Sequence, residues 1–465
     1  MIKHDADAIA REVNAGTLDP LAVVDAFDAL IAKRNGELNA LVGYTREVAL
    51  AEAEAVAKRV NLGMKLPLAG VPVIVKDNIF VAGRTISQGS RLFADFKPDG
   101  DAIAVERIRA AGAVVIGIGN CPEFACKGQT NSPLHGIARN PCDPSLTPGG
   151  SSGGNAAALA ADFAPIALGT DAGGSGRRPS AHTGTVGFKP SYGAIPYGPG
   201  FPEPFFGISV IAPMGRTVSD VTAVFSTIAG PDARDPDSIA IDPVSATFDP
   251  AQLRIAFSSR LGLEVPVDGD VTDAIAAGIE CLRGAGWRIQ QCDPVWPAGL
   301  SEAALMPLQA AGLAALHGSA FRHNPARFDP DVGAQIEAGL GYTGSDVAAA
   351  LEVSRLIKLS ASDFFAEFDL LICPTTPCVA WSVDRLGPSH IGGVAVPPRG
   401  HAVFTPFFNH ALTPAISIPC GYGRNDLPVG LQIIGRRGSD WRVLRAAKAA
   451  EACLAPINVR ARKVV

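Results

Sequence analysis

Residues 149–177 read GGSSGGNAAALAADFAPIALGTDAGGSGR and contain the strongest structural signal in the chain. It begins and ends in a glycine loop that carries a serine, Ser151 in the first loop and Ser175 in the second. The residues between the loops predict a helix over 154–161 and a strand over 165–168. Glycines beside a serine let the backbone adopt positive φ and bring its N–H groups close to a substrate. We therefore interpret this stretch as the functional site.

Strands and helices alternate on both sides of this stretch. Upstream, a short apolar run predicts a buried strand over 71–75 that ends at Lys76. Further helices are expected over 101–111, 345–367 and 440–450, and further strands over 113–118, 369–373, 415–418 and 429–434. Alternation of this kind predicts an α/β fold built on a sheet.

We interpret all 465 residues as a single domain with four consecutive segments. The first is predicted to be helical, with Asp19 and Pro20 marking one helix start. In the third, a turn-rich stretch near 231–250 precedes a peripheral strand over 253–257 and helices over 272–284 and 301–319. The segments are an N-terminal helical part over about 1–65, a core over about 66–230, a peripheral α/β part over about 231–340 and a C-terminal return to the sheet over about 341–465.

Composition limits the classes of protein and partner. With 47% hydrophobic and 18% charged residues the chain can bury a large core, and its net charge of −5 includes no basic stripe, which argues against nucleic acid as a direct partner. Nine scattered cysteines indicate reduced thiols and a cytoplasmic location. No secretory leader or membrane span is expected, and a homodimer is compatible with the sequence.

Lys76 is the candidate base for a serine nucleophile. A serine hydroxyl needs a base, and none of the eight histidines lies in either glycine loop. Lys76 ends an apolar strand, where burial disfavours the ammonium form. To act near neutral pH, its pKa must fall from about 10.4 to roughly 7 to 8, which burial of a lysine can achieve. The backbone N–H groups of Ala172, Gly173, Gly174 and Ser175 can supply an oxyanion hole.

The motifs around these residues resemble those of the amidase signature family, and the resemblance spans most of the chain. The matching stretches are 72–78, 120–140, 149–177 and 187–190, with outlying matches at 215–220, 374–377 and 427–432.

The resemblance implies a large central mixed β-sheet flanked by α-helices on both faces, and no metal or organic cofactor. It also implies a Ser-cisSer-Lys triad, in which Ser175 attacks a small-molecule amide, Ser151 relays the proton and Lys76 accepts it. The products would be an acid plus ammonia or an amine, formed through an acyl-Ser175 intermediate. Supporting roles fall to Ser152, Asp171 and Arg177.

Four residues depart from the family pattern near the site. Gly176 replaces a branched apolar residue and is expected to loosen the turn after Ser175. Arg178, Lys127 and His135 are additional cationic groups. Our hypothesis is that they favour a polar or anionic substrate.

Other functions for the same residues are less consistent with their context. Gly149 to Gly154 lacks the lysine of a phosphate-binding loop, which argues against nucleotide binding. A Ser-His-Asp esterase would need a hydrophobic strand before G-x-S-x-G, and the residues there indicate a loop. His401 and His410 are interpreted as structural or surface residues, and Cys126 or Cys142 as a weaker candidate nucleophile.

Two further alternatives concern the whole protein. The chain could be the amidase-like subunit of a glutamine-dependent amidotransferase complex, which we rank second because the segment 201–211 departs from the pattern of that group. An inactive scaffold conflicts with retention of Lys76, Ser151 and Ser175.

Overall fold

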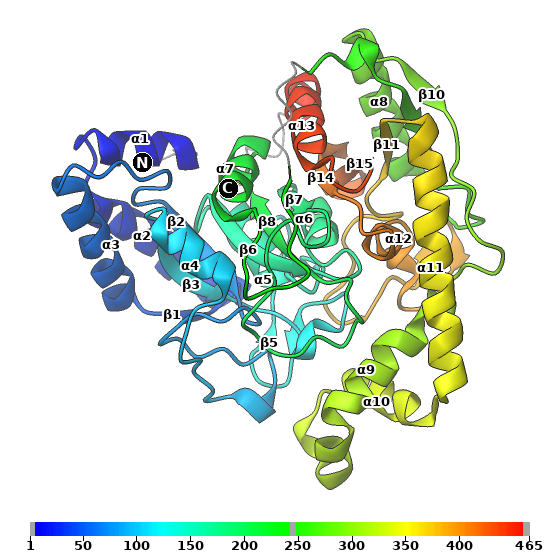
Figure 1. Ribbon diagram of the computed structural model, residues 1–465, viewed down its shortest axis with the longest axis horizontal. Coiled ribbons are helices and arrows are strands. Elements are labelled where there is room, and N and C mark those ends of the chain that lie inside the picture. The colour runs from blue at the N-terminus through cyan, green and yellow to red at the C-terminus, as the bar shows by residue number, and fades with distance from the viewer. Residues whose placement is uncertain (1–4, 242–247, 459–465) are drawn as a thin grey trace.

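The computed structural model describes residues 5–241 and 248–458 (Figure 1). Part of the turn-rich stretch near 231–250 and the outermost residues of the expected N-terminal and C-terminal segments therefore lie outside the described residues. The architecture is an 11-stranded sheet surrounded by helices. In spatial order its strands are β1 (Leu41–Tyr44), β3 (Val114–Gly119), β2 (Pro72–Lys76), β6 (Ile166–Asp171), β8 (Val210–Gly215), β7 (Val186–Lys189), β14 (Ala415–Tyr422), β15 (Pro428–Gly435), β11 (Leu370–Pro374), β9 (Ile255–Phe257) and β10 (Ile289–Gln291).

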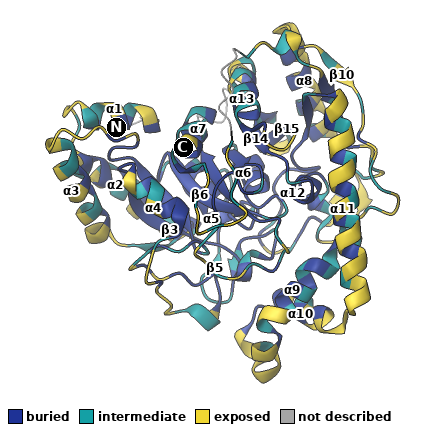
Figure 2. Ribbon diagram, in the orientation of Figure 1, coloured by how far each residue is buried: buried dark blue, intermediate teal, exposed yellow. Residues whose placement is uncertain are grey.

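The sheet is mixed, as predicted. At its centre β2 pairs in parallel with both β3 and β6, whereas β6 pairs antiparallel with β8. Every residue of β2, β3, β6 and β8 is buried, so these strands are covered on both faces (Figure 2). The parallel arrangement places the carboxyl ends of β2 and β6 at the same edge, which brings Lys76 and Asp171 to one side of the sheet.

The helices are α1 (Ala6–Asn14), α2 (Pro20–Leu38), α3 (Arg46–Asn61), α4 (Ile103–Ala110), α5 (Gly153–Ala160), α6 (Arg177–Thr183), α7 (Val218–Ile228), α8 (Gly269–Gly284), α9 (Glu302–His323), α10 (Pro330–Gly341), α11 (Gly344–Glu367), α12 (Pro406–His410) and α13 (Asp440–Leu454). Helix α2 begins where the sequence predicts, with Pro20 in its first turn and the Asp19 carboxylate accepting a hydrogen bond from the Leu21 N–H.

Helices cover both faces of the sheet, as consecutive residues of β15 demonstrate. A Cβ on Gly430 would press on Ala181 of α6, whereas the next side chain, Leu431, lies against Gly278 of α8. Neighbouring residues of a strand point to opposite faces, so α6 and α8 lie on opposite sides. The predicted α/β fold is confirmed.

The described residues of the N-terminal segment, expected to be helical over about 1–65, also include a strand, which corrects that expectation. Leu41–Tyr44 forms the edge strand β1, which pairs antiparallel with β3. Only four residues make this strand, and Gly43 lets it approach Ile118 closely. So short a run between two helices carries too little periodicity to be recognised in the sequence.

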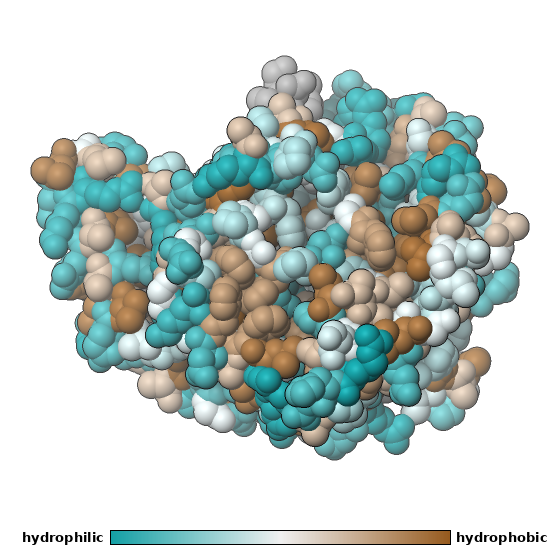
Figure 3. Space-filling view, turned by 60° about the horizontal axis from the view of Figure 1, so that its bottom comes forward, coloured by the Kyte–Doolittle hydropathy of each residue, from teal (hydrophilic) through white to brown (hydrophobic). Residues whose placement is uncertain are grey.

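The outer parts of the molecule are more exposed than the sheet. Helices α10 and α11 carry long exposed surfaces, while the central strands are buried (Figure 2). On the face shown in Figure 3, hydrophobic side chains gather near the middle and hydrophilic ones surround them. Within residues 5–241 and 248–458, no helix combines the length and apolar character needed to cross a bilayer.

Candidate active site

The loop that carries Ser175 connects β6 to α6. Within it Gly174 has a φ of +109°, a conformation that favours glycine. A Cβ at Gly174 would also collide with Thr405 Oγ1. Backbone conformation and close approach therefore both require glycine immediately before Ser175.

A buried ion pair fixes the shape of this loop. The Asp171 carboxylate accepts hydrogen bonds from Arg177 Nε at 3.0 Å and from Arg177 Nη2 at 2.9 Å. It also accepts the backbone N–H groups of Gly174 at 2.7 Å and Gly176 at 3.2 Å. Burial alone would raise the pKa of Asp171, but Arg177 and Asn409 hold it well below its usual value. The loop is therefore wrapped around a permanent negative charge.

This network corrects the expected oxyanion hole. Because the Gly174 N–H donates to Asp171, it is not available to a substrate oxygen. Ala172, Gly173 and Ser175 line the cavity described below, whereas Gly174 does not. The candidate donors are therefore the backbone N–H groups of these three residues.

Lys76 lies fully buried at the end of β2. Its Nζ is 2.8 Å from Ser151 Oγ and 2.8 Å from Thr170 Oγ1. Burial lowers the pKa of Lys76 to about 8, although Cys121 and Asp171 act in the opposite direction. With this pKa roughly a tenth of the amine is neutral at pH 7, and that neutral form can act as a base.

Ser151 lies in a loop whose two ends are hydrogen-bonded to Thr130. The peptide bond between Gly150 and Ser151 is cis. Thr130 Oγ1 donates to the Gly149 carbonyl at 2.9 Å and accepts the Gly153 N–H at 3.1 Å. The loop before α5 is therefore closed by a single hydroxyl from a distant segment.

Ser152 joins the two serine loops to each other. Its N–H donates to the Ser175 carbonyl at 3.1 Å, and its hydroxyl donates to the Thr170 carbonyl at 3.2 Å. The structure therefore brings the predicted residues Lys76, Ser151, Ser152 and Ser175 into one cluster.

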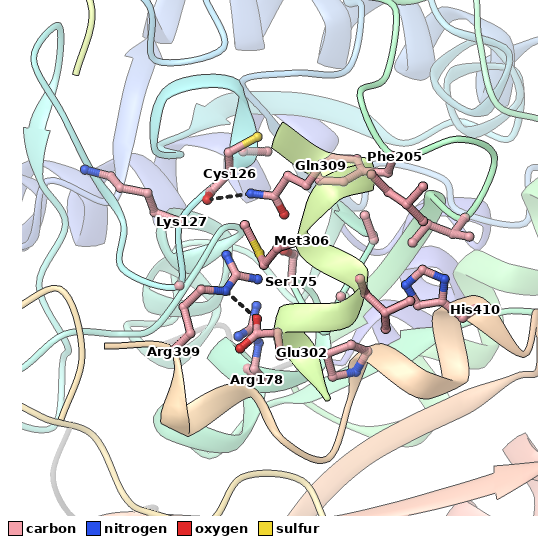
Figure 4. A pocket seen from close by; sticks show the side chains of 18 residues that line it. Cys126, Lys127, Ser175, Arg178, Phe205, Glu302, Met306, Gln309, Arg399 and His410 are labelled. Carbon is pink, nitrogen blue, oxygen red and sulfur yellow. Dashed lines mark hydrogen bonds and ion pairs between the residues drawn. The ribbon is translucent and has the colours of Figure 1, made fainter. Parts of the chain in front are cut away.

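Two cavities meet at Ser175 and Ala172. The first, of about 650 Å³, extends from Ser175 past Arg178 toward α9 (Figure 4). The second, of about 390 Å³, is lined by Ser151 and Thr170 as well as Ser175. A substrate that reaches Ser175 can therefore extend in two directions.

Several lining residues were not predicted from the sequence. Glu302, Met306 and Gln309 project from α9 into the first cavity, and Arg399 is ion-paired with Glu302 (Figure 4). They lie more than a hundred residues from Ser175 in the chain and belong to no local motif. Thr170 was also not predicted to contact Lys76. The one feature of the sequence that could have indicated this contact is its position next to Asp171, beside the second serine loop.

The three cationic residues that depart from the family pattern lie in different places relative to the cavities. His135 hydrogen bonds with Ser87 at 2.8 Å and lines neither cavity. Lys127 lines the first cavity, but its amino group points away from it (Figure 4). That amino group is paired with Asp329 at 2.5 Å. Arg178 does face the cavity.

Gly176 does not loosen the turn after Ser175, which corrects another expectation. It immediately precedes α6 and already has helical backbone angles, and a Cβ there would lie 2.9 Å from Ala212 Cβ. Glycine is required at this position by close packing against β8 and not by flexibility.

The rival nucleophile and base assignments find little support. Across the described residues, no histidine hydrogen bonds with the hydroxyl of Ser151 or Ser175. His401 and His410 are both buried, so neither is a surface residue. Burial raises the pKa of the Cys126 thiol, which disfavours the thiolate a cysteine nucleophile needs.

Comparison with known proteins places the chain in a family. The family model Amidase matches residues 22–444. The chain is 31% identical to one of the subunits of the glutamyl-tRNA(Gln) amidotransferase of Lachnospira eligens, with 97% of this chain and 98% of the relative covered. It is 35% identical to the corresponding polypeptide of Deinococcus deserti, with 97% and 96% covered.

Solved structures of similar fold indicate the same family. A bacterial aryl acylamidase of the amidase signature family superposes with a TM-score of 0.89 at 26% identity, covering 99% of this chain and 98% of that one. The fold and the glycine-serine loops define an amide-hydrolase class of protein. The chain belongs to the amidase signature family.

We predict that Asp171→Asn destabilises the fold by about 3–5 kcal/mol, because Arg177 would remain buried without a counter-charge. Urea unfolding followed by circular dichroism measures this change. Glu352→Gln, at the exposed ion pair between Glu352 and Arg355, is the matched control and should scarcely move the midpoint. Equal midpoints for the two variants would contradict the assigned role of Asp171.

Proposed function

We propose that this chain hydrolyses a carboxylic amide through an acyl-Ser175 intermediate. The observation that carries the proposal is the position of Lys76 Nζ, buried and 2.8 Å from Ser151 Oγ. No carboxylate among the described residues forms an ion pair with this amine. Its neutral form is therefore accessible, and the adjoining hydroxyl connects it to the cavity that contains Ser175.

In the proposed first half-reaction, Ser175 Oγ attacks the carbonyl carbon of the amide. The Ser175 proton passes to Ser151 Oγ as the Ser151 proton passes to Lys76 Nζ. Negative charge then develops on the carbonyl oxygen, facing the backbone N–H groups of Ala172, Gly173 and Ser175. When the C–N bond breaks, Lys76 returns its proton through Ser151 to the leaving nitrogen.

In the proposed second half-reaction, water attacks the acyl ester. Its proton follows the same route through Ser151 to Lys76 and returns to Ser175 Oγ as the C–O bond of the ester breaks. One buried amine therefore acts first as base and then as acid in each half-reaction. All other participants remain neutral hydroxyls or backbone amides.

The second part of the proposal concerns whether the chain acts alone or as part of a complex. The sequence alone ranks a stand-alone amidase first, but the curated relatives favour the alternative, since those compared above are components of amidotransferases and match nearly the whole chain. We therefore propose that the ammonia is passed to a partner protein in an amidotransferase-type assembly. We further propose that this occurs in the cytoplasm, in keeping with nine cysteines that are all free.

A stand-alone amidase remains the second candidate, and two observations favour it. The solved aryl acylamidase superposes on nearly the whole chain. In addition, the segment 201–211, which departs from the amidotransferase pattern, supplies part of the wall of the second cavity.

Substitution of the three proposed catalytic residues tests the chemistry. Ser175→Ala should lower kcat/KM for a small amide by about 10⁴-fold or more, because the attacking oxygen is lost. Lys76→Met and Ser151→Ala should each lower it by about 10³-fold, because they break the proton route. Ser226→Ala, at an exposed position of α7, should retain wild-type activity. Near-normal ammonia release by Lys76→Met would sink the mechanism.

The pH dependence tests the base. Because Lys76 must be neutral to accept a proton, kcat/KM should rise about tenfold per pH unit at low pH and level off above a pKa of about 8. The measurement uses an amide that has no titratable group in this range. A flat profile from about pH 6 to about pH 9 would exclude an amine of this pKa as the base.

Dependence of ammonia release on partner proteins distinguishes an amidotransferase component from a stand-alone amidase. If the chain works within an amidotransferase, purified protein should release ammonia from amides slowly, and proteins co-purified from its host should accelerate release and consume the ammonia. Rapid turnover of small amides by the isolated chain, with no acceleration by host proteins, would instead favour the stand-alone amidase.

A further inference from the structure

Arg178 is a buried cation of the first cavity that lacks a counter-ion. The residue is 6% exposed and lines the cavity together with Ser175. Its Nε has no hydrogen-bond partner, and across residues 5–241 and 248–458 its guanidinium forms no ion pair. A buried polar or charged group left unpaired is costly, which makes such an arrangement uncommon outside functional sites.

Glu302 and Asp171 act on Arg178 from beyond ion-pair distance, and each is already paired with another arginine, Arg399 and Arg177 respectively. Arg178 Nη1 lies 3.4 Å from His401 Nδ1, and burial followed by the nearby Arg178 charge keeps the pKa of His401 well below its usual value, so that imidazole is neutral. On the other side, Nε lies 2.9 Å from the position a Gly174 Cβ would occupy. The guanidinium therefore passes directly beside the loop that carries Ser175.

The other charges of the cavity pair among themselves. Arg399 and Glu302 form an ion pair across its wall (Figure 4). The Lys127 amino group points away from the cavity and lies 2.5 Å from Asp329 and 3.5 Å from Asp331, so it adds no charge to the cavity. Among the charged groups that remain in the described part of the lining, Arg178 and Arg399 face only one carboxylate, that of Glu302. The first cavity therefore carries one net positive charge close to the nucleophile, which a single anionic group would neutralise.

The two cavities differ in which half of an amide they can hold. Ser151 returns the proton to the leaving nitrogen in the proposed mechanism, and Ser151 lines the second cavity but not the first. The leaving nitrogen therefore faces the second cavity. The acyl chain, on the other side of the carbonyl carbon, extends into the first cavity toward Arg178.

We propose that the acyl half of the substrate carries a carboxylate and that Arg178 binds it. The substrates are then monoamides of short dicarboxylic acids and amides of the same pattern, with the carboxylate at the far end of the acyl chain. A guanidinium presents two parallel N–H groups that match a carboxylate and hold it in one orientation. This inference rests on the proposed hydrolysis at Ser175, and it specifies the substrate class.

Paired substrates test the proposal directly. Wild-type protein is assayed for ammonia release from glutaramate and succinamate, and from the neutral amides of matching length, valeramide and butyramide. We expect kcat/KM to be about 100-fold higher for the anionic member of each pair, because the neutral member leaves Arg178 unpaired. A ratio near one for both pairs would overturn the proposal.

Variants assign the preference to Arg178. Arg178→Gln should lower the anionic-to-neutral ratio at least about tenfold, and Arg178→Lys, which keeps the charge but loses the fork, should give an intermediate ratio. The control Arg355→Gln removes an exposed arginine from α11 and should keep the wild-type ratio. Identical ratios for Arg178→Gln and Arg355→Gln would also overturn it. The ratio compares two substrates in one preparation, so partial loss of folded protein does not alter it.

Binding without turnover separates this inference from the proposed reaction. Titration calorimetry measures the affinity of wild-type protein and of Arg178→Lys for glutarate and for pentane-1,5-diol, a neutral analogue of the same length that has no amide bond to hydrolyse. Suppose that the wild-type protein hydrolyses no amide but binds glutarate, and that Arg178→Lys binds glutarate more weakly. This result would refute the proposed function and support the anion site. Amide hydrolysis without charge preference or glutarate binding would leave the function standing and refute the site. If the protein neither hydrolyses amides nor binds glutarate, both the proposed function and the proposed anion site are refuted.

Discussion

Burial of the Lys76 amine governs both the packing around the site and the chemistry proposed for it. An ammonium group taken from water loses its hydration, and here two neutral hydroxyls, of Ser151 and Thr170, are its hydrogen-bond partners. The resulting fall of the pKa to about 8 requires that strand β2 be covered on both faces and that both serine loops close over its end. A less enclosed lysine would keep its charge and could not accept a proton.

Charge is managed differently on the two sides of Ser175. Beneath it, Asp171 and Arg177 neutralise each other and hold the loop in shape. Beside it, Arg178 remains unbalanced and faces the cavity. Two consecutive arginines of the same helix turn therefore have separate purposes, one in folding and, in our proposal, one in selecting the substrate. The sequence already separated the two residues, since the family resemblance gave Arg177 a supporting role and left Arg178 as an additional cationic group.

Sequence patterns predicted the parts of the fold in which local signals agree. Strands β2, β3 and β15 and helices α5 and α11 lie within a few residues of the expected ranges, because each combines a clear apolar pattern with turn residues at its ends. Strand β8 was missed, since Pro213 in its middle argues against a central strand. The serine loops were located from glycine content and order, but the Gly174 N–H was misassigned because its partner, Asp171, is set by the folded loop. Glu302 and Arg399 were missed because tertiary packing alone brings them to Ser175.

The protonation state of Lys76 is the most direct measure of this account. Neutron diffraction from deuterated crystals, at a pH about two units above a Lys76 pKa of about 8, would count the deuterons on Nζ. The account predicts two deuterons on Nζ and a Ser151 deuteron directed at its lone pair. Three deuterons on Nζ under those conditions would show an ammonium group that cannot act as the base, and would contradict the account.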